Sequence, residues 1–422
     1  MKKLIILVPR IKPNDANDIV NEQLKNILLK INSKCELKVI WVTFQPSRTQ
    51  NIDNGIFESV DFHNFNNGVE IIQKYNPDIL LIESRLGING IIFSQIGKSL
   101  NIPVVTIPGY IGSSEKFSSW FLFKNIFRLI YSKNVVGVPK HNAEKFAMLK
   151  YFKTKYFFLL RTMKKLDFNY LNLLKFILFY PLIHFFIKTY PPIHKITCGD
   201  LNLCFNKDLF QIYLKAGFPK SSIILEGDPV FDKVFSKKNA EKKQIFDRIS
   251  ILFCPTPMHE HGWMTKIDED NLILDTINSI NKNNTKLSLK IHPSTSSFDE
   301  YDLLLKQNQL DIPLFQKENT IELLKKYDVM ITYGSTDAIL EAILLKKIVI
   351  IIKIKQSKNF SRFFHKNLIK ICDDVNDLET IINDSIKIKI PENFYDDFIE
   401  KHIGKFDGKN SERIADLILG LK

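Results

Sequence analysis

Two apolar, strand-like runs within residues 286–352 constrain the fold of this chain more than any other feature. The first, KLSLKIHP, stops at His292-Pro293, and the second, VMITYGST, stops at 333–336, where a helix opens. Unbroken apolar strands that alternate with helices indicate a parallel sheet covered on both faces. A polar turn between a strand and a helix N-terminus presents backbone N–H groups to an anion. We therefore predict an α/β fold that binds a phosphorylated ligand at these turns.

The rest of the chain repeats this alternation on either side of a different central segment. Strand-like and helix-like runs alternate over 1–116 and again over 196–400, and an amphipathic helix closes the chain within 401–422. With 422 residues the chain is too long for one ordinary core, so two domains of about 200 residues are expected. We predict two Rossmann-like α/β domains that face a cleft. The first strand-to-helix turn lacks GxGxxG, the dinucleotide-binding fingerprint.

The central segment, 117–195, is basic and aromatic, and it holds nearly all of the net charge of +13. Between Lys124 and Lys195 there are fourteen Lys and Arg residues and only two acids. Positive charge concentrated in one segment indicates a basic surface. We therefore predict a helical insertion that docks on an anionic membrane. The aromatic residues form apolar clusters instead of alternating singly with basic residues, which argues against nucleic acid as a partner.

The apolar run 171–187 within this segment leaves two other interpretations open. One is a transmembrane helix, but the run is shorter than the roughly 20 residues such a helix needs and contains Lys175, Pro181 and His184. A spanning helix would also place the two domains on opposite sides of the bilayer, which a shared cleft forbids. The other is a buried helical hairpin whose lysines are solvated.

Cysteine usage and the N-terminus both bear on localisation. The five cysteines are scattered and form no CxxC pair, which indicates reduced thiols in a cytosolic chain. The N-terminal apolar run meets Pro9-Arg10 after five residues, which favours a first buried strand over a signal peptide. We expect a cytoplasmic protein, peripheral on the inner face of the cell membrane.

Four residues at the two opening turns, and one on the helix that follows the second turn, are candidates for binding the ligand. The His292 imidazole can donate to a phosphate oxygen or a sugar hydroxyl, or it can simply bond a nearby carbonyl. Gly334 permits a close backbone approach, and Ser335 or Thr336 can bond a phosphate or merely cap the helix. Glu341, one turn further on, can accept from ribose hydroxyls or lie in solvent.

A third strand-like run, ISILFCP, leads into the loop PTPMHEHGW. His259 and His261 flank Glu260 in this loop, but two residues at i and i+2 of an extended chain point to opposite sides. We expect no metal site here and a loop that lines the ligand cleft. The acids of 268–270 match DxD by letters but fall at a helix start, where acids suit the helix dipole.

A general base for a sugar hydroxyl would come from the N-terminal half. Asp15 and Asp18 follow the first strand, and Glu115 follows the turn PGYIGS. All three are expected at the sheet edge that faces the cleft. The sequence does not rank them.

Taken in order, these pieces resemble the GT-B superfamily. They are similar to the branch that UDP-N-acetylglucosamine 2-epimerase-like proteins share with transferases of capsular and surface polysaccharide biosynthesis. The matching stretches are IILEGDPVFDKV, ILFCPTPMHEHGW, LKIHP and TYGSTDAILEAILLKKIVIII. They cover about 195–352, and before that the likeness is one of topology only. The epimerases have a Gly-rich turn where this chain has YGST, and a His-Arg-x-Glu-Asn run that PMHEHGW matches only in part. These differences favour transfer over epimerisation.

The resemblance implies roles for both domains. The N-terminal domain would bind the acceptor and the C-terminal domain a nucleotide-activated sugar, without a cofactor or a metal. The residues implied for the donor are Gly227, Pro229, His259, Glu260, His292, Gly334, Ser335, Thr336 and Glu341. Our own candidates for catalysis, chosen from their positions after strands, are Asp15, Glu115 and His292.

The expected function is that of a glycosyltransferase that moves a sugar from a nucleotide donor to a lipid-linked or surface polysaccharide acceptor, as in capsule or cell-envelope synthesis. Three alternatives stay open. One is transfer of a polyol phosphate from a CDP-activated donor to a wall polymer. The others are 2-epimerisation of a UDP-sugar and a non-catalytic member that binds glycan or scaffolds a membrane assembly.

Overall fold

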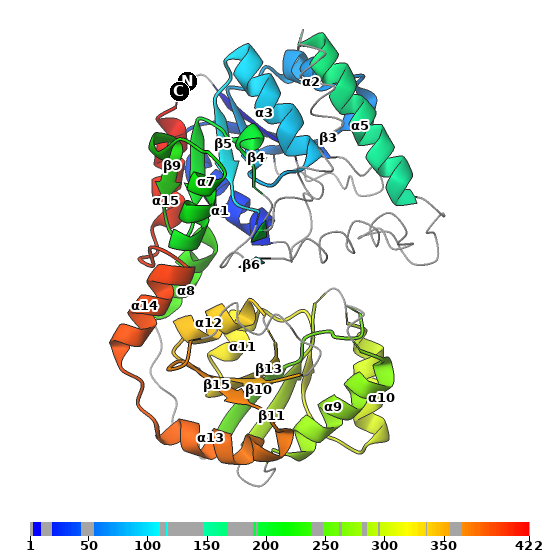
Figure 1. Ribbon diagram of the computed structural model, residues 1–422, viewed down its shortest axis with the longest axis vertical. Coiled ribbons are helices and arrows are strands. Elements are labelled where there is room, and N and C mark those ends of the chain that lie inside the picture. The colour runs from blue at the N-terminus through cyan, green and yellow to red at the C-terminus, as the bar shows by residue number, and fades with distance from the viewer. Residues whose placement is uncertain are drawn as a thin grey trace. The chain divides into compact units, whose positions relative to one another are not determined.

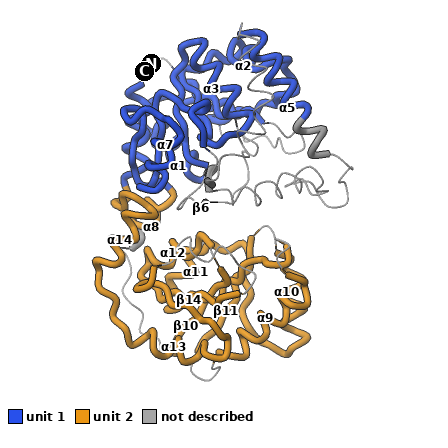
Figure 2. The backbone as a smooth tube through the Cα atoms, viewed as in Figure 1, with its two compact units in different colours: residues 1–229, 409–422 blue, residues 230–408 orange. Residues whose placement is uncertain are grey.

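The computed structural model divides the chain into two compact units, residues 1–229 with 409–422, and residues 230–408 (Figure 2). The residues it describes are 3–9, 19–43, 55–109, 115–116, 147–166, 189–190, 193–238, 248–260, 264–280, 285–293, 296–334, 336–354 and 365–421. Each unit is built on its own parallel sheet with helices on its faces (Figure 1). The predicted two-domain α/β architecture is confirmed.

Unit 1 contains a seven-stranded sheet of order β3-β2-β1-β4-β5-β8-β9, all parallel. Its strands are β1 (Leu4–Pro9), β2 (Leu37–Thr43), β3 (Phe57–Asp61), β4 (Ile79–Glu83), β5 (Val104–Ile107), β8 (Leu201–Cys204) and β9 (Ile223–Leu225). The continuous apolar strands pack on both faces, which is why they carry no polar alternation. A separate antiparallel pair joins β6 (Glu115–Lys116) to β7 (Thr189–Tyr190).

Two groups of helices cover the two faces of this sheet. On one face, α1 (Ile19–Asn32) packs beside the C-terminal helix α15 (Asn410–Leu419), with Ile414 and Ile418 fully buried. On the other lie α2 (Gly68–Tyr75), α3 (Ile88–Leu100) and α5 (Ala147–Lys165). A further helix, α7 (Lys207–Lys215), packs against β8 and β9. The apolar face of the last helix, which was predicted to be amphipathic, therefore packs the C-terminal end of the chain onto unit 1 (Figure 1).

Unit 2 contains a six-stranded parallel sheet of order β12-β11-β10-β13-β14-β15. Its strands are β10 (Ile249–Cys254), β11 (Thr285–Lys290), β12 (Leu314–Phe315), β13 (Val329–Tyr333), β14 (Ile348–Ile352) and β15 (Ile369–Cys372). Its helices are α8 (Asp232–Lys238), α9 (Lys266–Asn278), α10 (Phe298–Gln307), α11 (Thr320–Leu324), α12 (Ala338–Leu344), α13 (Leu378–Lys387) and α14 (Glu392–His402).

The expected domain boundary near residue 196 needs correction, because β8 and β9 extend the sheet of unit 1. Leu201 and Leu203 of β8 belong to the same hydrophobic core as residues of β5. The Thr106 hydroxyl of β5 also donates a 2.9 Å hydrogen bond to the Asn202 side-chain oxygen of β8. The break between the units falls after Pro229. Two α/β domains were correctly expected, but strand alternation alone does not reveal which sheet a short strand joins.

The segment 117–195 is likewise no separate domain where the structure describes it. Phe158, Leu159 and Met163 of α5 belong to the core of unit 1, and the Thr162 hydroxyl accepts a 2.8 Å hydrogen bond from the Gly68 amide. The apolar run 171–187 lies outside the described residues. Among the helices that are described, none is long and apolar enough to span a membrane.

Candidate functional site

The sheet of unit 2 reverses its strand order between β10 and β13. From β10 the chain moves outward to β11 and β12, and from β13 it moves outward on the other side to β14 and β15. Helices that follow neighbouring strands at such a point diverge to opposite faces, which leaves a crevice beyond the carboxyl ends of the strands. The position of a ligand site in this unit therefore follows from topology.

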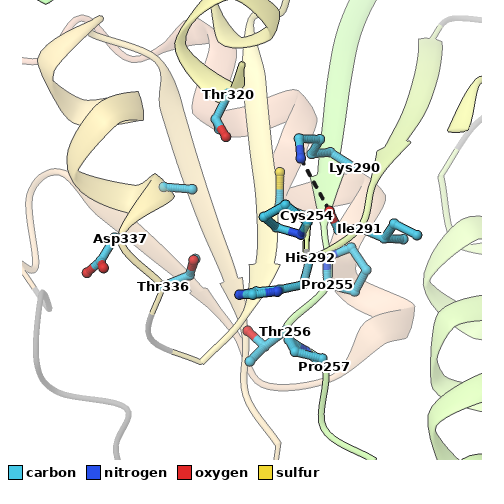
Figure 3. A pocket seen from close by; sticks show the side chains of 12 residues that line it. Cys254, Pro255, Thr256, Pro257, Lys290, Ile291, His292, Thr320, Thr336 and Asp337 are labelled. Atoms are coloured by element: carbon cyan, nitrogen blue, oxygen red, sulfur yellow. Dashed lines mark hydrogen bonds between the residues drawn. The ribbon is translucent and has the colours of Figure 1, made fainter. Parts of the chain in front are cut away.

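A pocket of about 230 Å³ lies at this point (Figure 3). Its walls come from the ends of β10 and β11 and from the starts of α11 and α12. The lining residues are Cys254, Pro255, Thr256, Pro257, Lys290, Ile291, His292, Pro293, Thr320, Thr336, Asp337 and Ala338. The set includes the hydroxyls of Thr320 and Thr336, an imidazole and an ammonium group, and these are donors that suit phosphate oxygens.

Two threonines hold the ends of β10 and β13 together beneath the pocket. Thr332 donates a 2.7 Å hydrogen bond to the carbonyl of Cys254, and Thr256 donates to the carbonyl of Tyr333. Both threonines are buried, so the two strand ends are held in register. The chain then turns at Gly334, whose φ of 63° is left-handed and costs glycine little.

The turn after β13 differs in detail from the expectation. Helix α12 begins at Ala338, and its N-cap residue is Asp337, whose side chain makes no capping hydrogen bond. Thr336 therefore lines the pocket without capping the helix, and Ser335 lies outside the described residues. Burial raises the pKa of Asp337 to about 6, so this carboxyl group in the pocket wall gains a proton in mildly acidic solution.

The other predicted donor residues of unit 2 do not line this pocket. His259 is exposed and Glu260 half-buried, in a loop whose first residues, 255–257, do line it. Glu341 is half-buried on α12, one turn away from the pocket-lining start of that helix. The structure thus brings together His292 and Thr336 from the predicted set.

Glu269 of α9 holds the loop that follows β10 in position by hydrogen bonds. Its buried carboxylate accepts hydrogen bonds from the amides of Met258, at 2.7 Å, and His259, at 3.3 Å. Burial and the neighbouring Glu260 raise its pKa. The acidic triplet 268–270 was expected to suit a helix start. Thr265 is the N-cap there and accepts from the Asp268 amide, while Glu269 supports the loop.

Gly227 and Pro229, predicted to contact the donor, lie in unit 1 and not in the pocket. The Gly227 amide donates to the Asn410 side-chain oxygen at 3.1 Å, and the Pro229 carbonyl accepts from Asn26 at 3.2 Å. Glu226, just before them, forms a 2.8 Å ion pair with Arg413. This turn therefore ties α1 and α15 together, which is a structural role.

Of the three predicted general bases, Glu115 alone lies within the described residues. Asp15 and Asp18 lie outside the described residues. Glu115 is in β6, opposite Tyr190 of β7.

Sequence reasoning missed Lys290, Asp337, Thr256 and Thr320 of the pocket. Lys290 had a visible signal, because it is the one charged residue between Leu287 and His292 in an apolar strand. A lysine is almost never so deeply buried without a partner or a function. Thr256 and Thr320 carried no comparable signal, since threonine is common in both strands and turns.

No family model and no curated protein matches this sequence. Solved structures do match. A putative UDP-N-acetylglucosamine 2-epimerase from Listeria monocytogenes has a TM-score of 0.52 at 12% identity, covering 99% of this chain and 96% of the other. The wall teichoic acid polymerase TagF has a TM-score of 0.52 at 15% identity, with 99% and 88% covered. A glycotransferase of kitacinnamycin has a TM-score of 0.52 at 9% identity, with 100% of both chains covered.

These three proteins share one fold, the two-domain α/β fold of the GT-B type, and this chain has it too. The predicted resemblance is therefore confirmed at the level of fold. At identities this low the likeness establishes the fold and not the reaction, because one fold hosts many functions.

Proposed function

We propose that this protein is a glycosyltransferase whose unit 2 binds a nucleotide-activated sugar. The observation that carries the proposal is the pocket at the strand reversal of unit 2, where His292, Lys290 and the hydroxyls of Thr320 and Thr336 gather. A volume of about 230 Å³ suits the diphosphate part of such a donor more than the whole molecule. Glu341 stays a candidate for the ribose of the nucleoside, and His259 and Glu260 stay candidates for the sugar, beyond the pocket.

In the proposed reaction, an acceptor hydroxyl oxygen attacks the anomeric carbon of the donor sugar. The bond from that carbon to the diphosphate oxygen breaks, the hydroxyl proton passes to a base, and a nucleoside diphosphate leaves. The leaving group carries the developing negative charge, which the donors of the pocket would stabilise without a metal or a cofactor. Asp15 and Glu115 stay our candidates for the base, and a glycan or lipid-linked saccharide our candidate acceptor.

A second candidate is transfer of a polyol phosphate from a CDP-activated donor to a wall polymer. The similarity to TagF, whose structure was solved with CDPG, favours it. The similarity to 2-epimerases keeps epimerisation of a UDP-sugar as a third candidate, and a non-catalytic glycan-binding or scaffold role is a fourth. All but the last need a nucleotide in the same pocket.

We also propose an anionic membrane surface as a partner, with the protein peripheral on the inner face of the cell membrane. The charge pattern of helix α5 supports this proposal. The helix has 19 residues and not one acid. Lys153, Phe157, Arg161 and Lys164 are exposed, and their spacing of three to four residues places them along one face. Basic residues around an exposed aromatic ring are typical of helices that lie on anionic lipid.

A thermal-shift panel of UDP, GDP, CMP and CDP tests the donor site. A ligand at 100 times its Kd stabilises the folded state by about 2.7 kcal/mol. A shift with UDP or GDP supports the glycosyltransferase, and a shift with CDP alone supports the polyol-phosphate transferase. The absence of a shift with all four nucleotides would exclude every donor-dependent candidate.

A further inference from the structure

Lys290 ends β11 with its side chain on the opposite face from its apolar neighbours. Leu289 and Ile291 belong to the core beneath the sheet, whereas Ser288 and Lys290 alternate with them. Ser288 accepts a 2.7 Å hydrogen bond from Tyr327. Lys290, at 6% exposure, lines the pocket instead.

The ammonium group of Lys290 is fixed by two backbone carbonyls. It donates to Gln316 at 2.6 Å and to Ile291 at 3.3 Å. The Gln316 side chain in turn donates to the Ser296 carbonyl at 2.8 Å, so the loops after β11 and β12 are joined. An ammonium has three N–H groups, and these bonds use two of them.

No carboxylate within the described part of the chain forms an ion pair with Lys290. Carbonyls satisfy its hydrogen bonds but leave its charge without a counter-ion, and a buried charge of this kind is costly. Burial lowers the pKa of Lys290, and the smaller effects of Cys254, Glu318 and Glu341 raise it. An anion in the pocket would neutralise the ammonium at the place where it is already held.

We propose that Lys290 is the residue that binds the charge of the diphosphate in this pocket, as the counter-ion of its phosphate oxygens. The inference rests on the proposed donor site and names the residue that makes this site selective for phosphates. His292 and the hydroxyls of Thr320 and Thr336 add hydrogen bonds, and Lys290 adds the positive charge. Asp337, in the same wall, opposes the anion whenever it is ionised.

The experiment measures, by calorimetry, the affinities of UDP, CDP, uridine, cytidine and inorganic pyrophosphate for the full chain. Lys290→Met removes the charge, and Lys290→Gln removes it but keeps an amide that can donate to the two carbonyls. Lys286→Met is the matched control, because Lys286 lies on the same strand and face, is exposed, and sits at the opposite end. Thermal unfolding shows which variants are folded.

We expect both Lys290 variants to lose about 10- to 100-fold in affinity for the nucleoside diphosphate and for pyrophosphate, the range for a charged hydrogen bond. Affinity for the matching nucleoside should not change, and Lys286→Met should bind as the wild type does. An equal loss for nucleoside and diphosphate would make Lys290 a structural residue and overturn the inference. So would unchanged diphosphate affinity.

The same data separate this inference from the proposed function. If the wild type binds pyrophosphate through Lys290 but no nucleotide, the anion site stands and the donor proposal fails. If nucleotides bind no better than nucleosides, the nucleotide site stands and the role of Lys290 fails. If nothing binds, both fail.

Discussion

The Gln23 side chain donates a 2.8 Å hydrogen bond to the carboxylate of Asp228, and both residues are fully buried although 205 positions separate them. The bond joins α1 to the turn after β9. That turn is part of the stretch IILEGDPVFDKV, which resembles a donor-binding motif in sequence. In the structure its polar groups face the helices of unit 1, and this assigns the turn to folding.

Asp228→Ala is expected to destabilise the protein without changing ligand binding. Removing the carboxylate leaves the buried Gln23 amide without its acceptor, which costs about 1–3 kcal/mol. Chemical denaturation would show the loss as a lower midpoint. Asp228→Asn is the control, because its amide oxygen can still accept from Gln23. A lower nucleotide affinity in folded Asp228→Ala would instead return this turn to the donor site.

His292→Ala and His259→Ala form a matched pair that separates the pocket from the loop beside it. His292 lines the pocket, whereas His259 is exposed outside it. We expect His292→Ala to weaken nucleoside diphosphate binding by about tenfold, the effect of one hydrogen bond to a charged group. His259→Ala should bind normally. The opposite ranking would move the donor site to the loop that follows β10.

Asp337 predicts a dependence of stability on pH. Its pKa is raised from 3.8 to about 6 by burial, so its ionised form is less favourable in the folded than in the unfolded chain. Stability is therefore lost as the pH rises from about 4 to about 6. Asp337→Asn cannot ionise, so it should be more stable than the wild type at pH 7 and equally stable below pH 4.

Unfolding midpoints at pH 4, 6 and 8 test this prediction. Asp337→Asn should also bind pyrophosphate more tightly than the wild type at pH 8, because a like charge leaves the pocket wall. Asp373→Asn, which removes an exposed carboxylate in a surface ion pair with Lys353, is the control. A constant difference between Asp337→Asn and wild type at all three pH values would contradict the assignment.

The membrane proposal predicts that charge reversal on α5 releases the protein from anionic vesicles. Each Lys or Arg near such a surface contributes about 1 kcal/mol, so Lys153→Glu with Lys164→Glu should weaken binding by at least about 30-fold. Co-sedimentation with phosphatidylglycerol-containing vesicles at low and high salt measures it. The double variant Lys286→Glu with Lys389→Glu makes the same change of charge on exposed residues of unit 2.

Two results would count against the membrane proposal. One is failure of the wild type to sediment with anionic vesicles at low salt, where screening is weakest. The other is an equal loss of binding in the α5 variant and in the unit 2 control, since that would indicate a response to net charge alone.

Much of the fold was predictable because it depends on local signals. The apolar runs that became β1, β4, β10 and β13 were recognisable from their lack of polar alternation, which parallel strands buried on both faces require. The last helix was recognisable from the spacing of Ile414 and Ile418. The short strands β12 and β15 were missed, because such edge strands carry little apolar pattern.

The sequence by itself determined that this chain forms parallel α/β sheets and that polar turns at 292–293 and 333–336 end two central strands. Only the tertiary structure decided which of these groups meet. It placed His292, Thr336, Lys290 and Asp337 around one pocket, and it assigned Gly227 and Asp228 to the joint between α1 and α15. The reason is physical. Strand patterns depend on neighbours in the chain, whereas sheet order and side-chain partners depend on contacts between residues far apart in it.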